Sequence, residues 1–278
     1  MTPGQLSRIF ATRVKIMPHY SVAYTYELTP RLSACNRPEQ NTANGLLSQK
    51  ARQRIQHACH WLKYLSNMEK RKLVFITLTL SQEQRHPDNF IRKHMLEPML
   101  KWIQRQYGAN LYVWKAEVQP QRYYKRNERC IHFHITTNRY IPYARLRHKW
   151  NSLQQAHGYI DGNIDTPSTE IRAVKNEKDF VNYMAKYLSK KEENPALTVN
   201  CKVWGCSRQL SRMNVTIGDD VTPDFHNIMD DFIKLTSEGE KQLKHAKLWF
   251  TSLRNKKKIP PALMEIIAKA RDDAKGEK

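Results

Sequence analysis

The sequence predicts an α+β fold in which helices cover one side of an antiparallel or mixed sheet. Over roughly residues 72–218, extended and helical patterns follow one another in the order β, α, ββ, α, β, α. Two consecutive extended stretches joined by a basic segment indicate a hairpin, and therefore antiparallel pairing. The chain has 278 residues, 40% of them hydrophobic, which is enough for one sizeable core. This order of elements is typical of α+β domains.

The chain before the hairpin contains a loop, two helices and a strand. Turn-forming residues dominate residues 30–45, and residues 47–70 have the apolar spacing of a helix. The run "KLVFITLTL" is apolar and β-branched, as expected of a buried strand. The segment "HPDNFIRKHMLEPMLKWIQRQYG" predicts a helix with Asp88 as its N-cap and Gly108 at its end, kinked or divided at Pro98.

The hairpin and the chain after it supply the other core elements. "NLYVWKAEVQ" and "CIHFHITTN" are the predicted hairpin strands, and "PQRYYKRNER" is a charged loop at the tip. Residues 143–157 predict a helix that ends at Gly158, and "TEIRAVK" predicts a further strand. "EKDFVNYMAKYLSKK" has acidic residues early and lysines late, which the helix dipole favours. "KVWGCSRQL" and "RMNVTI" are expected to be extended.

The pattern divides the chain into three regions. Residues 1–71 are expected to form an N-terminal extension packed on the core, and residues 72–218 the core itself. Residues 219–278 are predicted to be a helical, basic C-terminal segment, because the spacing is helical from about residue 222. "RNKKKIPP" interrupts that pattern as a linker and phosphate-binding patch.

The charge of the chain indicates a polyanionic partner. Lys and Arg number 47 against 26 Asp and Glu, a formal net charge of +21. The basic residues occur in every segment instead of one amphipathic helix, which favours nucleic acid over a membrane surface. No secretory signal and no run long enough to span a bilayer is found, so we expect a soluble intracellular protein. Five scattered cysteines indicate reduced thiols. Cys201 and Cys206 alone lack the second ligand pair of a zinc site.

Two histidines on one hairpin strand predict a metal site. His132 and His134 are two residues apart, so both imidazoles leave the same face, with Phe133 buried behind them. About 0.4 such pairs would arise by chance in this composition, so the pair alone could be two half-exposed strand histidines. Antiparallel register can place Glu117 opposite the pair, with Gln119 as the alternative third ligand. Two imidazoles and a carboxylate suit Mn²⁺ or Mg²⁺.

A later helix carries paired tyrosines and lysines. Tyr183 and Tyr187 lie one helical turn apart, about 6 Å along the axis, and Lys186 and Lys190 each follow a tyrosine by three residues. The alternative is amphipathic packing with a solvated lysine edge. Tyrosine titrates near pH 10, so a neighbouring cation is needed to favour the nucleophilic phenolate. The pattern therefore predicts two tyrosine nucleophiles assisted by lysines.

The order of these motifs resembles that of HUH endonucleases. "FITLTL", the Glu117 strand, "HFH" and "YMAKYLSKK" follow one another as in the rolling-circle replication initiators of small single-stranded DNA phages and plasmids, and "VWGCSRQLS" is similar to the family's closing segment. The resemblance implies a central RRM-like or ferredoxin-like antiparallel sheet. It implies a metal site of His132, His134 and Glu117.

The same resemblance implies the chemistry of the tyrosine helix. Tyr183 and Tyr187 would attack DNA in turn, each forming a 5′-phosphotyrosine link and freeing a 3′-OH, with assistance from Lys186 and Lys190. A single nucleophile, with Tyr187 structural, stays an alternative. The charged insertion before "CIHFH" departs from relatives that have a short glycine turn there.

The expected role is therefore that of a metal-dependent nickase and strand transferase that acts on single-stranded origin DNA in the cytoplasm of a bacterial host. The chain has no Gly-Lys dipeptide, which excludes a P-loop, so a host helicase is the expected partner. A rolling-circle transposase is the alternative within the same chemistry. A non-catalytic nucleic-acid-binding module, stacking bases on Tyr123 and Tyr124, is the alternative outside it.

Candidate DNA contacts lie in three basic stretches. At the hairpin tip they are Arg122, Lys125, Arg126 and Arg129, and Lys191 follows the tyrosine helix. The "RNKKK" stretch at 254–258 is the third candidate. For any one of these side chains, the alternative is a solvated loop charge.

Overall fold

The structure is a computed structural model, and it describes residues 10–16, 21–27, 47, 49–174, 194–213, 215–217, 237–243 and 246–251. Contacts within the chain divide it into two units. One unit comprises Met1–Glu39 and Arg212–Lys278, and the other comprises Gln40–Ser211.

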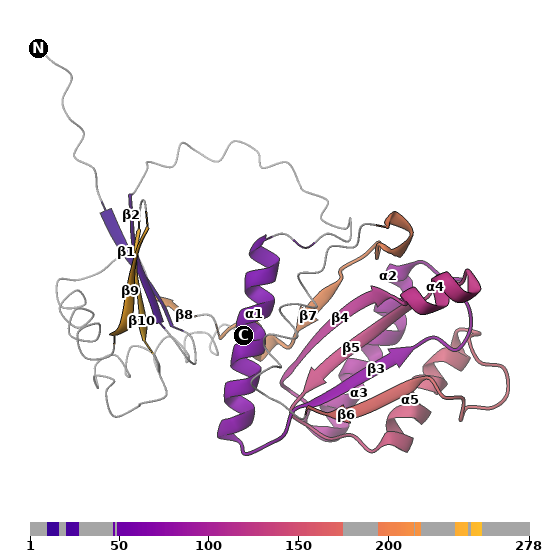
Figure 1. Cartoon of the computed structure of the whole chain (residues 1–278). Coiled ribbons are helices and arrows are strands. Elements are labelled where there is room, and N and C mark those ends of the chain that lie inside the picture. The colour runs from indigo at the N-terminus through magenta and orange to yellow at the C-terminus, as the bar shows by residue number, and fades with distance from the viewer. Residues whose placement is uncertain are drawn as a thin grey trace, which may run out of the picture. The chain divides into compact units, whose positions relative to one another are not determined.

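The larger unit is built on a five-stranded antiparallel sheet with flanking helices (Figure 1). The strand order is β6-β3-β5-β4-β7, so β5 lies at the centre, between the strand before the hairpin and its own hairpin partner. This arrangement confirms the predicted α+β class and its antiparallel sheet. The strands are β3 (Val74–Thr79), β4 (Tyr112–Val118), β5 (Ile131–Thr137), β6 (Thr169–Ala173) and β7 (Trp204–Cys206).

One face of this sheet packs against helical segments to form the core. Figure 1 shows α2 (Asp88–Ile91), α3 (Glu97–Tyr107) and α5 (Tyr143–Ala156) on the same side of the sheet. Phe133 is fully buried in this layer, with the rings of Trp114 and Trp150 edge-on to it at 6.4 Å. Because side chains alternate along a strand, this packing turns the residues before and after Phe133 to the opposite face.

The helix over residues 88–107 is continuous, but it contains a wider turn. A π-helical turn, η1 (Arg92–Leu96), joins α2 to α3 shortly before Pro98. Proline has no N–H and its ring crowds the carbonyl four residues earlier, and a π turn relieves that conflict. The helix therefore neither kinks sharply nor divides. Gly108 ends it in the left-handed conformation, with φ of 61°, as predicted.

The tip of the hairpin is helical, which corrects the predicted loop. α4 spans Pro120–Arg126, with Pro120 in its first turn, where a missing N–H costs nothing. Asn127 closes the helix in the left-handed region, with φ of 56°. Below α4, the N–H of Gln119 donates to the carbonyl of Cys130 at 2.8 Å, so the hairpin register continues to the base of α4.

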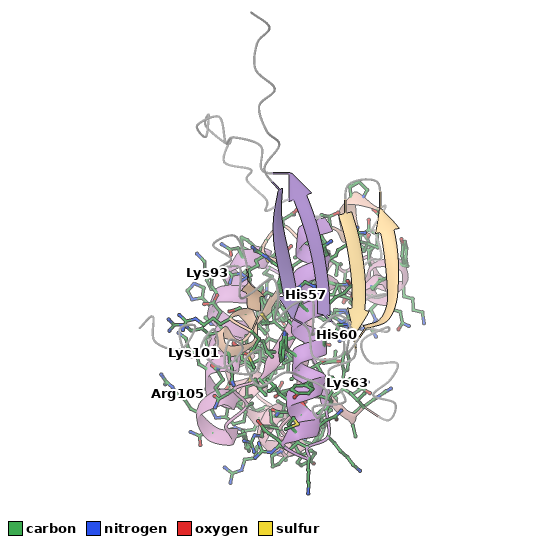
Figure 2. All side chains as sticks on the ribbon, turned by 90° about the vertical axis from the view of Figure 1, so that its left-hand side faces the viewer. His57, His60, Lys63, Lys93, Lys101 and Arg105 are labelled. Atoms are coloured by element: carbon green, nitrogen blue, oxygen red, sulfur yellow. The ribbon has the colours of Figure 1, made fainter. Side chains whose placement is uncertain are left out.

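The first helix of this unit, α1, spans Gln49–Met68 and contacts β4, β7 and the short helix α7 (Arg208–Ser211). Basic side chains are spread over several elements of the unit. Figure 2 labels Lys63 on α1, Lys93 on η1, and Lys101 and Arg105 on α3. Within the described part of the chain, no helix combines the length and apolar character needed to cross a membrane.

The other unit is built on a second antiparallel sheet, of order β8-β1-β2-β10-β9. It contains β1 (Phe10–Ile16), β2 (Ser21–Glu27), β8 (Val215–Ile217), β9 (Ser237–Leu243) and β10 (Ala246–Thr251). The helical prediction beyond residue 222 is therefore wrong for β9 and β10. Their lysine, glutamate and leucine residues favour helix locally, but pairing between β9, β10 and β2 determines their conformation.

Candidate metal centre

The sheet brings Glu117 and both predicted histidines together. Glu117 on β4 is directly opposite His132 on β5, as the predicted register requires. Glu117 Oε1 lies 2.8 Å from His132 Nε2 and 3.1 Å from His134 Nε2. The potential ligand atoms of the three residues all lie within 4.8 Å of one another. Both histidines are buried and Glu117 is half-buried, so the group is a compact triad on the sheet face opposite the helical core.

The charge state of the triad suits a cation. Burial alone would raise the pKa of the Glu117 carboxyl, but hydrogen bonds with His132 and His134 and the charge of Lys115 hold it well below its usual range. Burial, aided by the positive charges of His132 and Lys115, lowers the pKa of His134, although Glu117 opposes this. At neutral pH the site therefore offers an ionised carboxylate and a neutral imidazole with a lone pair.

Two neighbours on β3 orient His134. Thr77 is opposite His134 in the sheet, and its Oγ1 lies 3.2 Å from His134 Nδ1. The ring of Phe75 stacks on His134 at 5.1 Å with an interplanar angle of 25°. Holding Nδ1 in this way aims Nε2 at Glu117, the arrangement in which a second residue orients a ligand. Neither residue was predicted from the sequence, although the alternation in "FITLTL" places both on one strand face.

The donor set fits a divalent cation. Two imidazole nitrogens and one carboxylate supply three ligands and leave other positions open. Gln119, the alternative third ligand, has its Oε1 buried with no hydrogen-bond donor among the described residues. Such an atom at the edge of the group is consistent with a site that binds a further polar partner.

The predicted nucleophiles and their lysines are not among the described residues. This applies to Tyr183, Lys186, Tyr187, Lys190 and Lys191.

The described chain on either side of these residues is anchored at two different places. The N–H of Val174, just after edge strand β6, donates to the carbonyl of Leu73 at 2.9 Å. Asn194 donates from its side chain to the hydroxyl of Tyr124 on α4 at 3.4 Å. Because α4 joins β4 to β5 beside Glu117 and His132, the second anchor lies at the triad end of the sheet.

The candidate DNA contacts at the hairpin tip differ in how freely they can meet a phosphate. The guanidinium of Arg122 donates to Glu128 Oε2 at 2.8 Å and to the carbonyl of Leu80 at 2.6 Å. Lys125 and Arg126 are exposed on α4, next to Tyr124, which is 67% exposed. Arg122 therefore has a structural role, whereas Lys125 and Arg126 present their charges to solvent.

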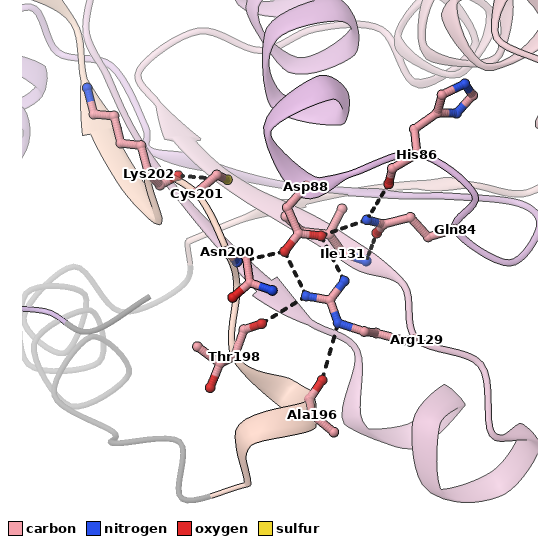
Figure 3. A network of polar contacts seen from close by, with 10 residues as sticks. All are labelled: Gln84, His86, Asp88, Arg129, Ile131, Ala196, Thr198, Asn200, Cys201 and Lys202. Carbon is pink, nitrogen blue, oxygen red and sulfur yellow. Dashed lines mark hydrogen bonds and ion pairs between the residues drawn. The ribbon is translucent and has the colours of Figure 1, made fainter. Parts of the chain in front are cut away.

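A buried ion pair between Asp88 and Arg129 lies at the base of β5 (Figure 3). The Asp88 side chain is 2% exposed, and its oxygens accept hydrogen bonds from Arg129 at 2.8 and 2.7 Å. Gln84 donates to the same carboxylate at 2.6 Å, as does the backbone N–H of Asn200 at 2.7 Å. The predicted role of Asp88 as an N-cap is wrong, because Pro87 occupies that position and the carboxylate is directed to Arg129.

The same network connects β5 to the chain that follows residue 193. Gln84 Oε1 accepts the N–H of Ile131, the residue before His132, at 2.8 Å. Arg129 donates to the carbonyl of Thr198 at 2.8 Å and to that of Ala196 at 3.2 Å (Figure 3). The network therefore holds the start of the histidine strand and residues 196–200 in one arrangement.

Comparison with known proteins gives one match. Residues 73–192 match the ORF2-type family of replication-associated proteins. The matched region begins just before β3, contains the whole triad, and covers less than half of the chain. Neither the curated proteins nor the solved structures contain a significant match. The central region is thus similar to replication-associated proteins, which supports a role in DNA replication.

Proposed function

We propose that this protein is a replication initiator that nicks single-stranded origin DNA and rejoins strands in rolling-circle replication. One observation carries the proposal: Glu117, His132 and His134 form a potential metal site within the region that matches replication-associated proteins. The proposal includes an HUH endonuclease fold, with a ferredoxin-like arrangement of the central sheet. Mn²⁺ or Mg²⁺ is the proposed cofactor, a host helicase the proposed partner, and the bacterial cytoplasm the proposed location.

In the proposed reaction, the phenolate oxygen of Tyr183 or Tyr187 attacks the phosphorus of one phosphodiester. A phosphotyrosine ester forms at the 5′ side, the bond from phosphorus to the 3′ oxygen breaks, and that oxygen takes up a proton. A bound divalent cation would polarise the phosphate and stabilise charge on its non-bridging oxygens. Lys186 and Lys190 would favour the phenolate. The second tyrosine would repeat the transfer, because the ester retains the energy of the broken bond.

We expect a covalent protein–DNA adduct that survives denaturation. The purified protein is incubated with Mn²⁺ and single-stranded DNA that contains a candidate origin, and the products are separated on a denaturing gel. Chelation of the metal should abolish the adduct, since phosphate activation depends on it. Tyr183→Phe and Tyr187→Phe should each reduce adduct formation, and the double variant should form none, since phenylalanine keeps the ring and removes the nucleophile.

The alternatives predict different gels. A non-catalytic binding module retards DNA without any adduct, so tight binding with no adduct on any origin-bearing DNA would overturn the proposal. An adduct abolished by Tyr183→Phe and unaffected by Tyr187→Phe would indicate a single nucleophile. A rolling-circle transposase would form the same adduct but would act on transposon ends instead of a replication origin.

We also expect DNA affinity to fall steeply with salt concentration, because several phosphates must be neutralised. Replacing both Lys125 and Arg126 with alanine should weaken binding and reduce the slope of log K against log salt by roughly 1.4, since each single-strand phosphate contact contributes about 0.7. Fluorescence anisotropy over a series of salt concentrations measures this slope. A slope that both variant and parent share would show that α4 does not contact DNA.

A further inference from the structure

Lys115 lies beside the metal centre, although it belongs to none of the motifs in the sequence. It precedes Glu117 by two residues on β4, so the two side chains leave the same face of the strand, and it is directly opposite His134. Its Nζ donates to Glu117 Oε2 at 3.2 Å. The Lys115 side chain is only 12% exposed.

The two oxygens of Glu117 are divided between two kinds of partner. Oε1 contacts the imidazoles of His132 and His134, whereas Oε2 accepts from Lys115. A cation held by the triad would compete with the Lys115 ammonium for the same carboxylate. It would also place a double positive charge a few ångströms from that ammonium, and like charges at that distance repel strongly.

The nearby arginines are engaged elsewhere. Arg122 donates to Glu128, and Arg129 is bound to Asp88. A largely buried ammonium needs an anionic or hydrogen-bonding partner. If Glu117 turns toward a metal ion, Lys115 requires another anion on the same face. The anion that the proposed reaction brings to this position is a phosphodiester.

We propose that Lys115 is a second cationic group of the site, which competes with the divalent cation for Glu117 in the free protein and binds a non-bridging oxygen of the scissile phosphate in the complex. This inference rests on the proposed nicking function. It assigns Lys115 two opposite effects: it weakens metal binding, and it accelerates attack on the phosphate. A lysine that served only to hold the strands together would not have both effects.

The test measures metal affinity and reaction rate separately, on the full chain. Mn²⁺ binding is measured by calorimetry without DNA for the parent protein and for Lys115→Met, Lys115→Arg and Lys101→Met. Lys115→Met should bind Mn²⁺ about tenfold more tightly, since a competing positive charge is removed. Lys115→Arg should bind Mn²⁺ as the parent does. Lys101, exposed on α3 (Figure 2), is the matched control, and its variant should be unchanged.

Adduct formation is then measured at saturating Mn²⁺ and DNA. Lys115→Met should react about 100-fold more slowly, the usual cost of losing one group that stabilises charge in the transition state. Lys115→Arg keeps the charge and should retain part of the rate. Thermal melting of each variant verifies that it is folded.

Each contrary result overturns a defined part of the inference. Equal or weaker Mn²⁺ binding by folded Lys115→Met overturns the competition for Glu117. An unchanged rate at saturation overturns the contact with phosphate. If the parent protein forms no adduct, the nicking function and the phosphate contact both fail, whereas the calorimetry still decides the competition.

Discussion

Replacing Glu117 with glutamine is expected to abolish both metal binding and adduct formation. The substitution keeps the size of the side chain but removes the carboxylate that contacts His132 and His134 at 2.8 and 3.1 Å. Loss of a residue that merely orients a metal ligand costs about 10–100-fold in affinity or activity, so loss of the ligand itself should cost more than about 100-fold. Calorimetry with Mn²⁺ and the adduct assay measure the two effects.

The control for this prediction is Thr77→Val. Valine matches threonine in shape but cannot bond to His134 Nδ1, so the triad stays complete while one orienting contact is lost. We expect a loss of about 10–100-fold in metal affinity for this variant, smaller than for Glu117→Gln. Parent-like Mn²⁺ affinity in folded Glu117→Gln would exclude the triad as the metal site.

Replacing Asp88 with alanine is expected to destabilise the larger unit by about 3–5 kcal/mol, because it leaves the guanidinium of Arg129 without its anion in a largely buried network. The Asn200 N–H and Gln84 lose the same acceptor. Urea unfolding followed by circular dichroism measures the loss. Glu97→Ala removes another ion pair, with Arg92, but the Glu97 side chain is 44% exposed, so this variant should lose less than about 1 kcal/mol. Equal losses in the two variants would contradict this expectation.

The same aspartate predicts how stability depends on pH. Burial raises the pKa of the Asp88 carboxyl, but hydrogen bonds from Arg129, Asn200 and Gln84 and the charge of Arg129 outweigh it, so the pKa lies below the ordinary value of 3.8. A carboxyl with a lowered pKa in the folded state contributes its full stability above the ordinary pKa and loses it as the pH falls through the folded value. The parent should therefore lose stability in this acidic range, and Asp88→Ala should lose less over the same range.

The metal centre was largely predictable because its geometry follows from local rules. A period of two places His132 and His134 on one face, and an antiparallel hairpin places Glu117 opposite them. The structure adds Thr77 and Lys115, whose roles depend on which strands pair. Thr77 reaches His134 only because β3 joins β5 across 57 residues, a pairing that no local pattern specifies.

The parts that were predicted wrongly depend on contacts distant in sequence or on end signals. Asp88 looks like an N-cap locally, but Arg129, 41 residues later, takes its carboxylate. The strands β9 and β10 contain helix-forming residues and become a sheet by pairing with each other and with β2. For α4 the signals were present, since Pro120 suits the first turn of a helix and Asn127 suits its end.

The central position of β5 has a consequence for how the site is assembled. β5 is hydrogen-bonded to β3 on one side and β4 on the other, and it carries two of the three triad residues. The entropy lost in fixing these ligands is thus lost once, when the sheet folds, and not again when a cation arrives. A site preorganised in this way can exchange its cation without reordering the backbone, so metal occupancy can follow the surrounding concentration while the fold stays constant.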